Sequence, residues 1–515
     1  MLNSNEGGTI MKKNIYIFLA VAVLSLTSCE SFMDINYDPN SPAAENVDNS
    51  MILPAVEMNL AATYADYLNI VGGYYCQVYA HQFGTSNYLD YSQFTMSATR
   101  SSGAYTQLYQ RALANAEVIR NNAKEEEDWG TYLAATTLRA FAFQLLVDCY
   151  GEVPYTEALD ASNLAPKYDE GKYIYEGIIA ELDDALSKVS ASDIVVTNFT
   201  FPGKTAESWI EFANAQKLKM LVRMSDVKDV KAQVQAIIDG GQLPSSDIAL
   251  SGCWAQEAGH ESPFWAEEFS TLGGSTQINI VANLAIINTM QQVDGEGIIL
   301  YTDPRLASFF APNASNAYVG NISGTNNSNS ASPLNSTANW CRPVASYDMP
   351  VYLITVAEVE FFLAEFYARQ NNAVQAEAHY NAAIAASCAT AGVAGTEALV
   401  IAQFPYSQAN YKQSIGVSKW IALAGINCFE AYTETRRLHY PAFGKVKGSD
   451  MYTGSGTQNT AAYVAGTLYT PYLVDGQIGD NKMLERFPYA ESSESRNTKT
   501  PDFKGYTTPI FWSAN

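Results

Sequence analysis

The sequence predicts a predominantly all-α protein, an α-α superhelix of stacked helix pairs that carries large loop-rich insertions. Three observations support this fold class. Apolar residues recur at helical spacing over several long stretches. One stretch of 34 residues has the pattern of a helix–turn–helix repeat, and long segments rich in Asn, Ser, Gly, Thr and Tyr interrupt the helices. With 47% hydrophobic and only 16% charged residues, the chain can bury a large core.

The clearest helix pair spans residues 355–388. Val359, Leu363 and Phe366 line one expected helix, and Tyr380 lies on the apolar face of the next. A short polar turn joins them, and alanines stand where the two helices must approach closely. The length and spacing match a tetratricopeptide-type unit. The other helical stretches are too divergent to align with it, so the superhelix is inferred from one good unit and several weaker ones.

Further helices are expected in the first half of the chain. The stretch 103–150 predicts two helices, and the second should end at Gly151, because glycine favours the position after a helix and Pro154 prevents its continuation. The ranges 171–190 and 205–225 each carry one more apolar stripe.

These patterns predict one domain from residue 51 to residue 515. We expect its helical scaffold at about 51–240 and 351–440, and its loop-rich insertions at about 241–350 and 441–500. Between 313 and 339, Asn, Ser and Gly account for 16 of 27 residues. Loops of this length in a folded domain are usually functional or mobile, so we expect the insertions to bind the ligand.

Residues 1–28 predict a secretory signal. A basic start precedes an almost wholly apolar run, which is too short to cross a bilayer, and small residues precede Cys29. Leu-Thr-Ser-Cys resembles the bacterial lipobox, whose cysteine is acylated and anchors the mature protein; an ordinary signal peptide with a coincidental cysteine is the alternative. We place the biological start at Met11 and expect residues 29–50 to form a strap between the lipid and the helical body.

The residues after the anchor alternate as calcium ligands do. Asp34, Asn36, Asp38 and Asn40 occupy positions 1, 3, 5 and 7 of an EF-hand loop. However, Pro39 stands at position 6, where the loop needs glycine for its sharp turn. We therefore expect turns in an extended strap, and neither a metal nor a cofactor.

Catalytic patterns are mostly missing. The four histidines show no metal-ligand spacing, and no GxSxG or complete phosphate-binding loop is present. Glu267 and Glu268, near Trp265, could serve glycoside hydrolysis, which needs two carboxyls, but an acidic chain has many such neighbours. The net charge of −23 also makes nucleic acid an unlikely partner, because a phosphate backbone would be repelled.

The six cysteines between 76 and 428 include no CxxC pair, so neither a zinc ribbon nor a dithiol site is indicated. Cys149, Cys388 and Cys428 fall in apolar helical patterns and are expected to be buried thiols. Cys253 and Cys341 stand in loops beside tryptophans, and a disulfide between them stays open at this point.

Seven stretches in a fixed order resemble the SusD/RagB family of lipid-anchored, nutrient-binding proteins on the outer-membrane surface of Bacteroidetes. Each stretch alone is weak, but together they run from residue 29 to residue 497. They are CESFMDINYDPNSP, TTLRAFAFQLLVDCYGEVPYTEAL, WIEFANAQKLKMLVRMS, DPRLASFF, AEVEFFLAEFYAR, FEAYTETRRLHYP and ERFPYAESSESRN.

The resemblance implies about four tetratricopeptide-like helix pairs that support a loop-rich region. It also implies that the protein captures a glycan, or in some relatives a peptide, and delivers it without chemistry to a TonB-dependent transporter of the SusC type, over which it acts as a lid. Cys29 would anchor it in the outer membrane, exposed at the cell surface. A peptide-binding or protein-binding scaffold of the same fold and a surface glycosidase are the competing functions.

We expect the ligand to meet aromatic rings that stack on sugar faces, and amide or guanidinium groups that bind sugar hydroxyls. The alternative for each ring is local packing of the insertion. Arginines in the shared motifs are expected to be structural: Arg139, Arg305, Arg436, Arg437 and Arg486. The ligand-binding candidates, chosen on loop position and residue type, are Asn87, Tyr88, Tyr91, Trp254, Trp265, Tyr318, Trp340 and Arg342.

Overall fold

The computed structural model describes residues 48–82, 87–160, 162–196, 205–272, 279–325, 339–452 and 458–513. Contacts divide the chain into residues 1–51 and residues 52–515, and the description below concerns the second unit. The expected signal, Cys29 and the calcium-like stretch lie outside the described residues. Among the helices that are described, none combines the length and the apolar character needed to span a membrane.

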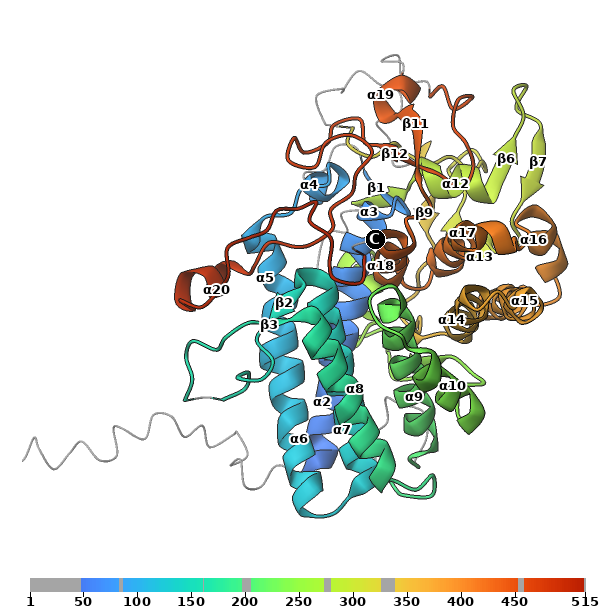
Figure 1. The fold of residues 1–515 in the computed structure, drawn as a ribbon. Coiled ribbons are helices and arrows are strands. Elements are labelled where there is room, and N and C mark those ends of the chain that lie inside the picture. The colour runs from blue at the N-terminus through green and yellow to red at the C-terminus, as the bar shows by residue number, and fades with distance from the viewer. Residues whose placement is uncertain are drawn as a thin grey trace, which may run out of the picture. The chain divides into compact units, whose positions relative to one another are not determined.

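Four helix pairs form the scaffold of the described residues, which confirms the tetratricopeptide-like fold (Figure 1). Helix α9 also packs on α14, so residues from the two halves of the chain meet directly. The pairs are α6 (Ala114–Glu125) with α7 (Trp129–Tyr150), α8 (Gly171–Lys188) with α9 (Glu207–Arg223), α14 (Val356–Arg369) with α15 (Ala373–Thr390), and α17 (Tyr411–Leu423) with α18 (Cys428–Leu438).

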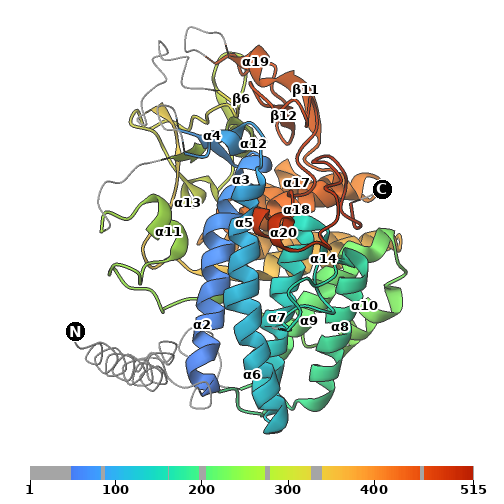
Figure 2. The ribbon, with the colours of Figure 1, turned by 90° about the vertical axis from the view of Figure 1, so that its left-hand side faces the viewer.

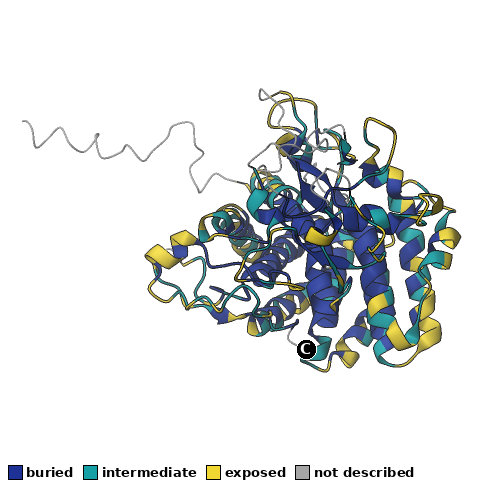
Figure 3. Ribbon diagram, turned by 90° about the horizontal axis from the view of Figure 1, so that it is seen from above, coloured by how far each residue is buried: buried dark blue, intermediate teal, exposed yellow. Residues whose placement is uncertain are grey.

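Helix α7 is almost completely buried, with 21 of its 22 residues buried. Neighbouring helices cover it on all sides, which explains why it is apolar all round instead of along one stripe. The Asp128 side chain accepts a hydrogen bond from the Thr131 amide at its start, and Gly151, with φ of 80°, ends it as predicted. Figure 3 shows this buried interior among half-buried and exposed segments.

Two long helices near the start of this unit each contain a π-helical turn. Helix α2 (Asn49–Ala62) continues through η3 (Thr63–Leu68) into α3 (Asn69–Tyr75), and α5 (Ala98–Gln107) continues through η4 (Leu108–Leu113) into α6. Figures 1 and 2 both show them alongside α7. A π turn inserts one extra residue and is often found at a functional site.

The expected insertions hold short helices and strands instead of loops alone, and further short strands lie between the scaffold helices. The antiparallel pairs are β1 (Tyr79–His81) with β5 (Ile280–Ala282), β2 (Glu152–Val153) with β3 (Asp169–Glu170), β4 (Ile248–Leu250) with β10 (Val351–Ile354), β6 (Gln291–Val293) with β7 (Ile299–Thr302), and β8 (Phe310–Ala311) with β9 (Arg342–Pro343). Strands β11 (Phe443–Lys447) and β12 (Leu468–Thr470) are parallel.

The remaining helices are short and lie mostly in these insertions or at the edge of the scaffold. They are α4 (Leu89–Ser92), η5 (Met224–Asp226), α10 (Lys231–Gly240), α11 (Pro263–Glu268), α12 (Leu284–Met290), α13 (Leu306–Phe309), α16 (Glu397–Gln403), η8 (Gln408–Asn410), α19 (Gly448–Met451) and α20 (Glu491–Arg496).

A buried ionic network ties the helix pairs together. Arg223 of α9 donates from Nη1 to Asp148 Oδ2 at 2.7 Å and from Nε to Glu434 Oε1 at 2.9 Å, and it also pairs with Glu430. The network comprises Asp148, Lys219, Arg223, Glu358, Glu365, Lys419, Glu430, Glu434 and Arg437, which lie on α7, α9, α14, α17 and α18.

The cations of this network keep its carboxylates ionised. Burial alone would raise the pKa of Glu430, but Arg223 and Lys219 hold that pKa at about 2. Arg437 and Lys419 likewise hold the pKa of Glu434 well below its ordinary value against the effect of burial.

The arginines of the shared motifs are confirmed as structural. Arg437 pairs with Glu365 and Glu434, Arg305 with Asp303, and Arg139 with Glu117 and Glu181; Arg436 and Arg486 donate to backbone carbonyls.

The six cysteines between 76 and 428 are all free thiols. Cys149, Cys388 and Cys428 are buried thiols as predicted. Cys253 and Cys341 are both free thiols, so the disulfide left open between them is not formed.

Candidate functional site

Helix α11 packs against the π-helical turn η3 and helps to form an open cavity of about 270 Å³. We call it the α11 cavity. Its lining comes from elements far apart in sequence, because η3, α4, α5 and α11 meet here. The polar side chains in the lining are Asp66, Tyr67, Asn87, Tyr88, Tyr91, Thr99, Arg100 and Glu267.

Two stacked tyrosines, Tyr88 and Tyr91, line the α11 cavity. The rings of Tyr88 and Tyr91 are nearly parallel, with centroids 5.7 Å apart, and both are buried. Tyr88 has φ of 61°, a left-handed conformation that is uncommon for a bulky residue. Its hydroxyl donates to Glu267 Oε1 at 2.9 Å. The pair therefore holds the Glu267 carboxylate in place, and its buried rings leave little surface on which a sugar could stack.

Arg100 supplies a positive charge at the rim. Its Nε donates to Asp90 Oδ2 at 3.1 Å, and its guanidinium carbon lies 5.3 Å from the centre of the Tyr91 ring. The Tyr67 hydroxyl donates to the Arg100 backbone oxygen at 2.6 Å and fixes the start of α5. Because 40% of the Arg100 side chain is exposed, it can meet a ligand while staying oriented.

Two acids near α11, Asp66 and Glu268, have raised pKa values. Burial, with smaller contributions from Glu267 and Glu268, raises the pKa of Asp66 to about 8. Burial raises the pKa of Glu268 to about 7, although hydrogen bonds from Asn279 oppose this change. A carboxyl that keeps its proton near neutral pH can donate as well as accept a hydrogen bond, and such perturbed groups are typical of functional sites.

Trp265 of α11, Phe269 just after it and Arg342 of β9 form a short stack, which we call the aromatic ladder. The Trp265 and Phe269 rings stack with centroids 5.7 Å apart, and the Arg342 guanidinium lies 5.2 Å from the Phe269 ring. Trp265 Nε1 donates to Glu261 Oε1 at 3.0 Å, which orients the indole. All three members, Trp265, Phe269 and Arg342, are half-buried, so each presents part of its surface to solvent.

The structure brings five of the eight candidate residues to α11. Asn87, Tyr88 and Tyr91 line the cavity, and Trp265 and Arg342 belong to the ladder.

The other three candidates belong neither to the cavity lining nor to the ladder. Trp254 is 8% exposed within the main core, and Trp340 is 2% exposed and packs with Ala80 and Val281. Tyr318 packs against the core close to Cys341. Burial favours the packing interpretation for both tryptophans.

The three charged residues that line the cavity were not among the candidates: Asp66, Arg100 and Glu267. Asp66 carried a usable signal, because it is the only charged residue in the apolar stretch from 58 to 75. Glu267 was considered only as half of a catalytic pair with Glu268. Since Glu268 is 2% exposed and accepts a hydrogen bond from the Asn279 amide, the two carboxyls do not face one open space, and the geometry does not support glycoside hydrolysis.

Metal ligands do not gather in the part of the chain that the structure describes. Within those ranges, no group of three or more His, Cys, Asp or Glu side chains is arranged to hold an ion.

Comparison with known proteins points to one family. Residues 39–460 match the family model SusD-like_2, described as starch-binding and associating with the outer membrane. No curated protein matches the chain significantly.

Solved structures of SusD homologs and of a chitin-binding protein share the fold. A SusD homolog from Bacteroides uniformis is 19% identical, with a TM-score of 0.70 over 90% of this chain and 99% of that one. A SusD homolog from Parabacteroides distasonis is 18% identical, with a TM-score of 0.69 over 90% and 95%. A chitin-binding protein is 18% identical, with a TM-score of 0.67 over 90% and 100%.

Proposed function

Because the chain belongs to the SusD-like family of starch-binding proteins that associate with the outer membrane, we propose that it captures a glycan at the cell surface. It then delivers that glycan to a TonB-dependent outer-membrane transporter of the SusC type. The α11 cavity and the aromatic ladder are the proposed binding site. The role is capture and transfer, in which no bond of the ligand is made or broken.

The observation that carries this proposal is the mixture of groups around α11. A sugar ring has hydroxyls around its edge and C–H groups on its faces, so it needs hydrogen-bonding groups beside an apolar surface. The α11 cavity supplies an amide from Asn87, carboxyls from Asp66 and Glu267, and a guanidinium from Arg100. The exposed part of Trp265 supplies the apolar surface.

The experiment is isothermal titration of the soluble protein with glycan panels. Starch-derived and chitin-derived oligosaccharides come first, because the family description and one structural relative name these polymers. We expect Trp265→Ala to weaken binding about tenfold, equivalent to about 1.4 kcal/mol. Tyr173→Ala is the matched control, because it removes an aromatic side chain that is 53% exposed elsewhere on the surface.

Three results would contradict the site or the function. Equal losses in the Trp265 and Tyr173 variants would place the site away from α11. Binding of extended peptides with no binding of any glycan would favour the peptide-binding scaffold, in which the aromatic residues form a protein interface. Release of reducing sugar during the titration would reopen the glycosidase hypothesis.

The anchor and the partner need experiments of their own. Cys29→Ser should abolish incorporation of labelled fatty acid and release the protein from the outer membrane, if Cys29 is the acylated residue. Affinity purification of the native lipoprotein from mild detergent should recover an outer-membrane transporter. Failure to recover one after cross-linking in intact cells would contradict the proposed partnership.

A further inference from the structure

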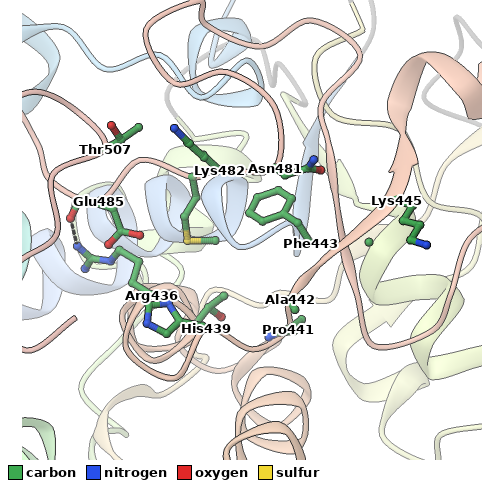
Figure 4. A pocket seen from close by; sticks show the side chains of 13 residues that line it. Arg436, His439, Pro441, Ala442, Phe443, Lys445, Asn481, Lys482, Glu485 and Thr507 are labelled. Carbon is green, nitrogen blue, oxygen red and sulfur yellow. Dashed lines mark hydrogen bonds between the residues drawn. The ribbon is translucent and has the colours of Figure 1, made fainter. Parts of the chain in front are cut away.

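A second cavity lies at the end of α18, away from the residues that line the α11 cavity (Figure 4). Its volume of about 640 Å³ is large enough for one or two sugar rings, since ligand sites commonly span about 300–1,000 Å³. Its walls come from residues 435–445, from residues 481–485 and from Thr507. We call it the C-terminal cavity.

The walls of the C-terminal cavity are fixed to the scaffold. Arg436 of α18 donates from Nη1 to the Glu485 backbone oxygen at 2.6 Å, which joins the helix to the 481–485 segment. The Asn481 amide donates to Thr470 Oγ1 at 2.9 Å and ties the same segment to β12. The site is therefore formed before any ligand arrives, so binding requires little ordering of the chain.

Two lysines of this cavity lack a counter-ion. Lys445 and Lys482 are exposed, and neither has a carboxylate within 4.0 Å in the described part of the chain. Lys447, by contrast, pairs with Asp480 outside the lining. The chain as a whole carries a charge of −23, but charges beyond about 8 Å are screened at physiological salt. An anion inside the cavity would therefore experience mainly the local positive charge.

The opposing charge inside the cavity is weak. Glu485 is its one acidic lining residue among those described, and burial raises the pKa of that carboxyl to about 7, although Arg436 acts in the opposite direction. Figure 4 shows the Phe443 ring between the segment carrying Lys482 and the turn that follows His439. Phe443 is half-buried, so part of its ring is open to the cavity.

We propose that the C-terminal cavity binds a saccharide whose rings carry anionic groups. Figure 4 shows Lys445 and Lys482 on opposite sides of Phe443, so each ammonium group binds an anionic group on a different ring of the saccharide, and a ring between them lies against Phe443. The choice of a saccharide rests on the proposed glycan-binding function. The cavity would add a preference that the α11 cavity cannot provide, because Arg100, the cation that lines the α11 cavity, already pairs with Asp90. Lysine acts as a point charge and suits a carboxylate or a sulfate ester equally, so both are tested.

The test is titration with three probes: an oligogalacturonate, the same oligosaccharide with its carboxylates reduced to alcohols, and a sulfated oligosaccharide. We expect one or both acidic probes to bind at least tenfold more tightly than the reduced probe. Lys445→Gln with Lys482→Gln should remove this advantage, and Phe443→Ala should weaken binding about threefold or more. Lys447→Gln with Lys499→Gln is the control, because it removes the same charge from exposed lysines outside the cavity.

Thermal unfolding of both double variants confirms that each is folded. Equal loss in the two double variants would overturn the proposal, because the effect would then come from overall charge. Acidic probes that bind no better than the reduced probe would also overturn it. If neutral glycans still bind and respond to Trp265→Ala, the proposed function stands while this inference falls. If no glycan of either kind binds, both fall.

Discussion

The buried ionic network and the surroundings of α11 both hold carboxyl groups away from water, but only the network places a cation within ion-pair distance of each one, among the described residues. Glu430 consequently has a lowered pKa, of about 2, whereas Glu268 has a raised pKa, of about 7. In the network, ion pairs stabilise the contacts between helix pairs. Near α11, the carboxyls of Asp66 and Glu268 are held away from water with no described cation within ion-pair distance, which lowers the stability of the folded state. A cost of this kind is typical of a site that serves binding.

The largest expected effect comes from breaking the network at Arg223. Arg223→Met leaves Asp148, Glu430 and Glu434 without their shared cation and should lower the free energy of unfolding by about 3–5 kcal/mol. Urea denaturation followed by circular dichroism measures it. A loss below about 1 kcal/mol would show that the remaining lysines compensate, and the contrast between the two regions would then be wrong.

The second effect has the opposite sign and depends on pH. Between about pH 4.5 and about pH 7, Glu268 keeps its proton in the folded state but has lost it in the unfolded chain. The free energy of unfolding therefore falls as the pH rises across that interval. Glu268→Gln should therefore raise the free energy of unfolding at pH 8 by on the order of 2 kcal/mol and leave it nearly unchanged at pH 4.

Urea denaturation at both pH values measures this gain, with Glu296→Gln as a control, because Glu296 is exposed in the turn between β6 and β7. A Glu268→Gln variant that loses stability at pH 8 would show that its ionised form is favourable, and the α11 region would then resemble the network.

The smallest effect on stability separates binding from folding. Arg100→Gln breaks a half-exposed ion pair with Asp90, so it should change the free energy of unfolding by less than about 1 kcal/mol. Glycan affinity should nevertheless fall about tenfold, because the charged donor at the rim of the α11 cavity is lost. Parallel denaturation and titration measure the two quantities. Unchanged affinity would remove Arg100 from the proposed site.

Helical periodicity made the scaffold predictable. The stretch 355–388 folds as α14 and α15, and the helix before Gly151 ends where the glycine requires it. Helix α11 could not be predicted in the same way, because its six residues complete less than two helical turns and show no period.

The binding residues were only partly predictable, because residue type in a loop does not reveal which side faces solvent. Trp254 and Trp265 look alike in the sequence, yet the first is buried and the second is half-buried on α11. Arg100 enters the site only because α5 packs near η3, and this long-range contact leaves no local pattern.

The antiparallel pairing of β4 with β10 has a consequence for how this protein can change over evolution. Leu250 lies opposite Val351, so the hundred-residue segment between them leaves and rejoins the scaffold at neighbouring points. The entropic cost of closing such a loop grows by only about 0.6 kcal/mol for each doubling of its length. Insertions and deletions in the exposed turns of this segment therefore need not strain the helix pairs, and a relative could acquire a new ligand while retaining the same framework.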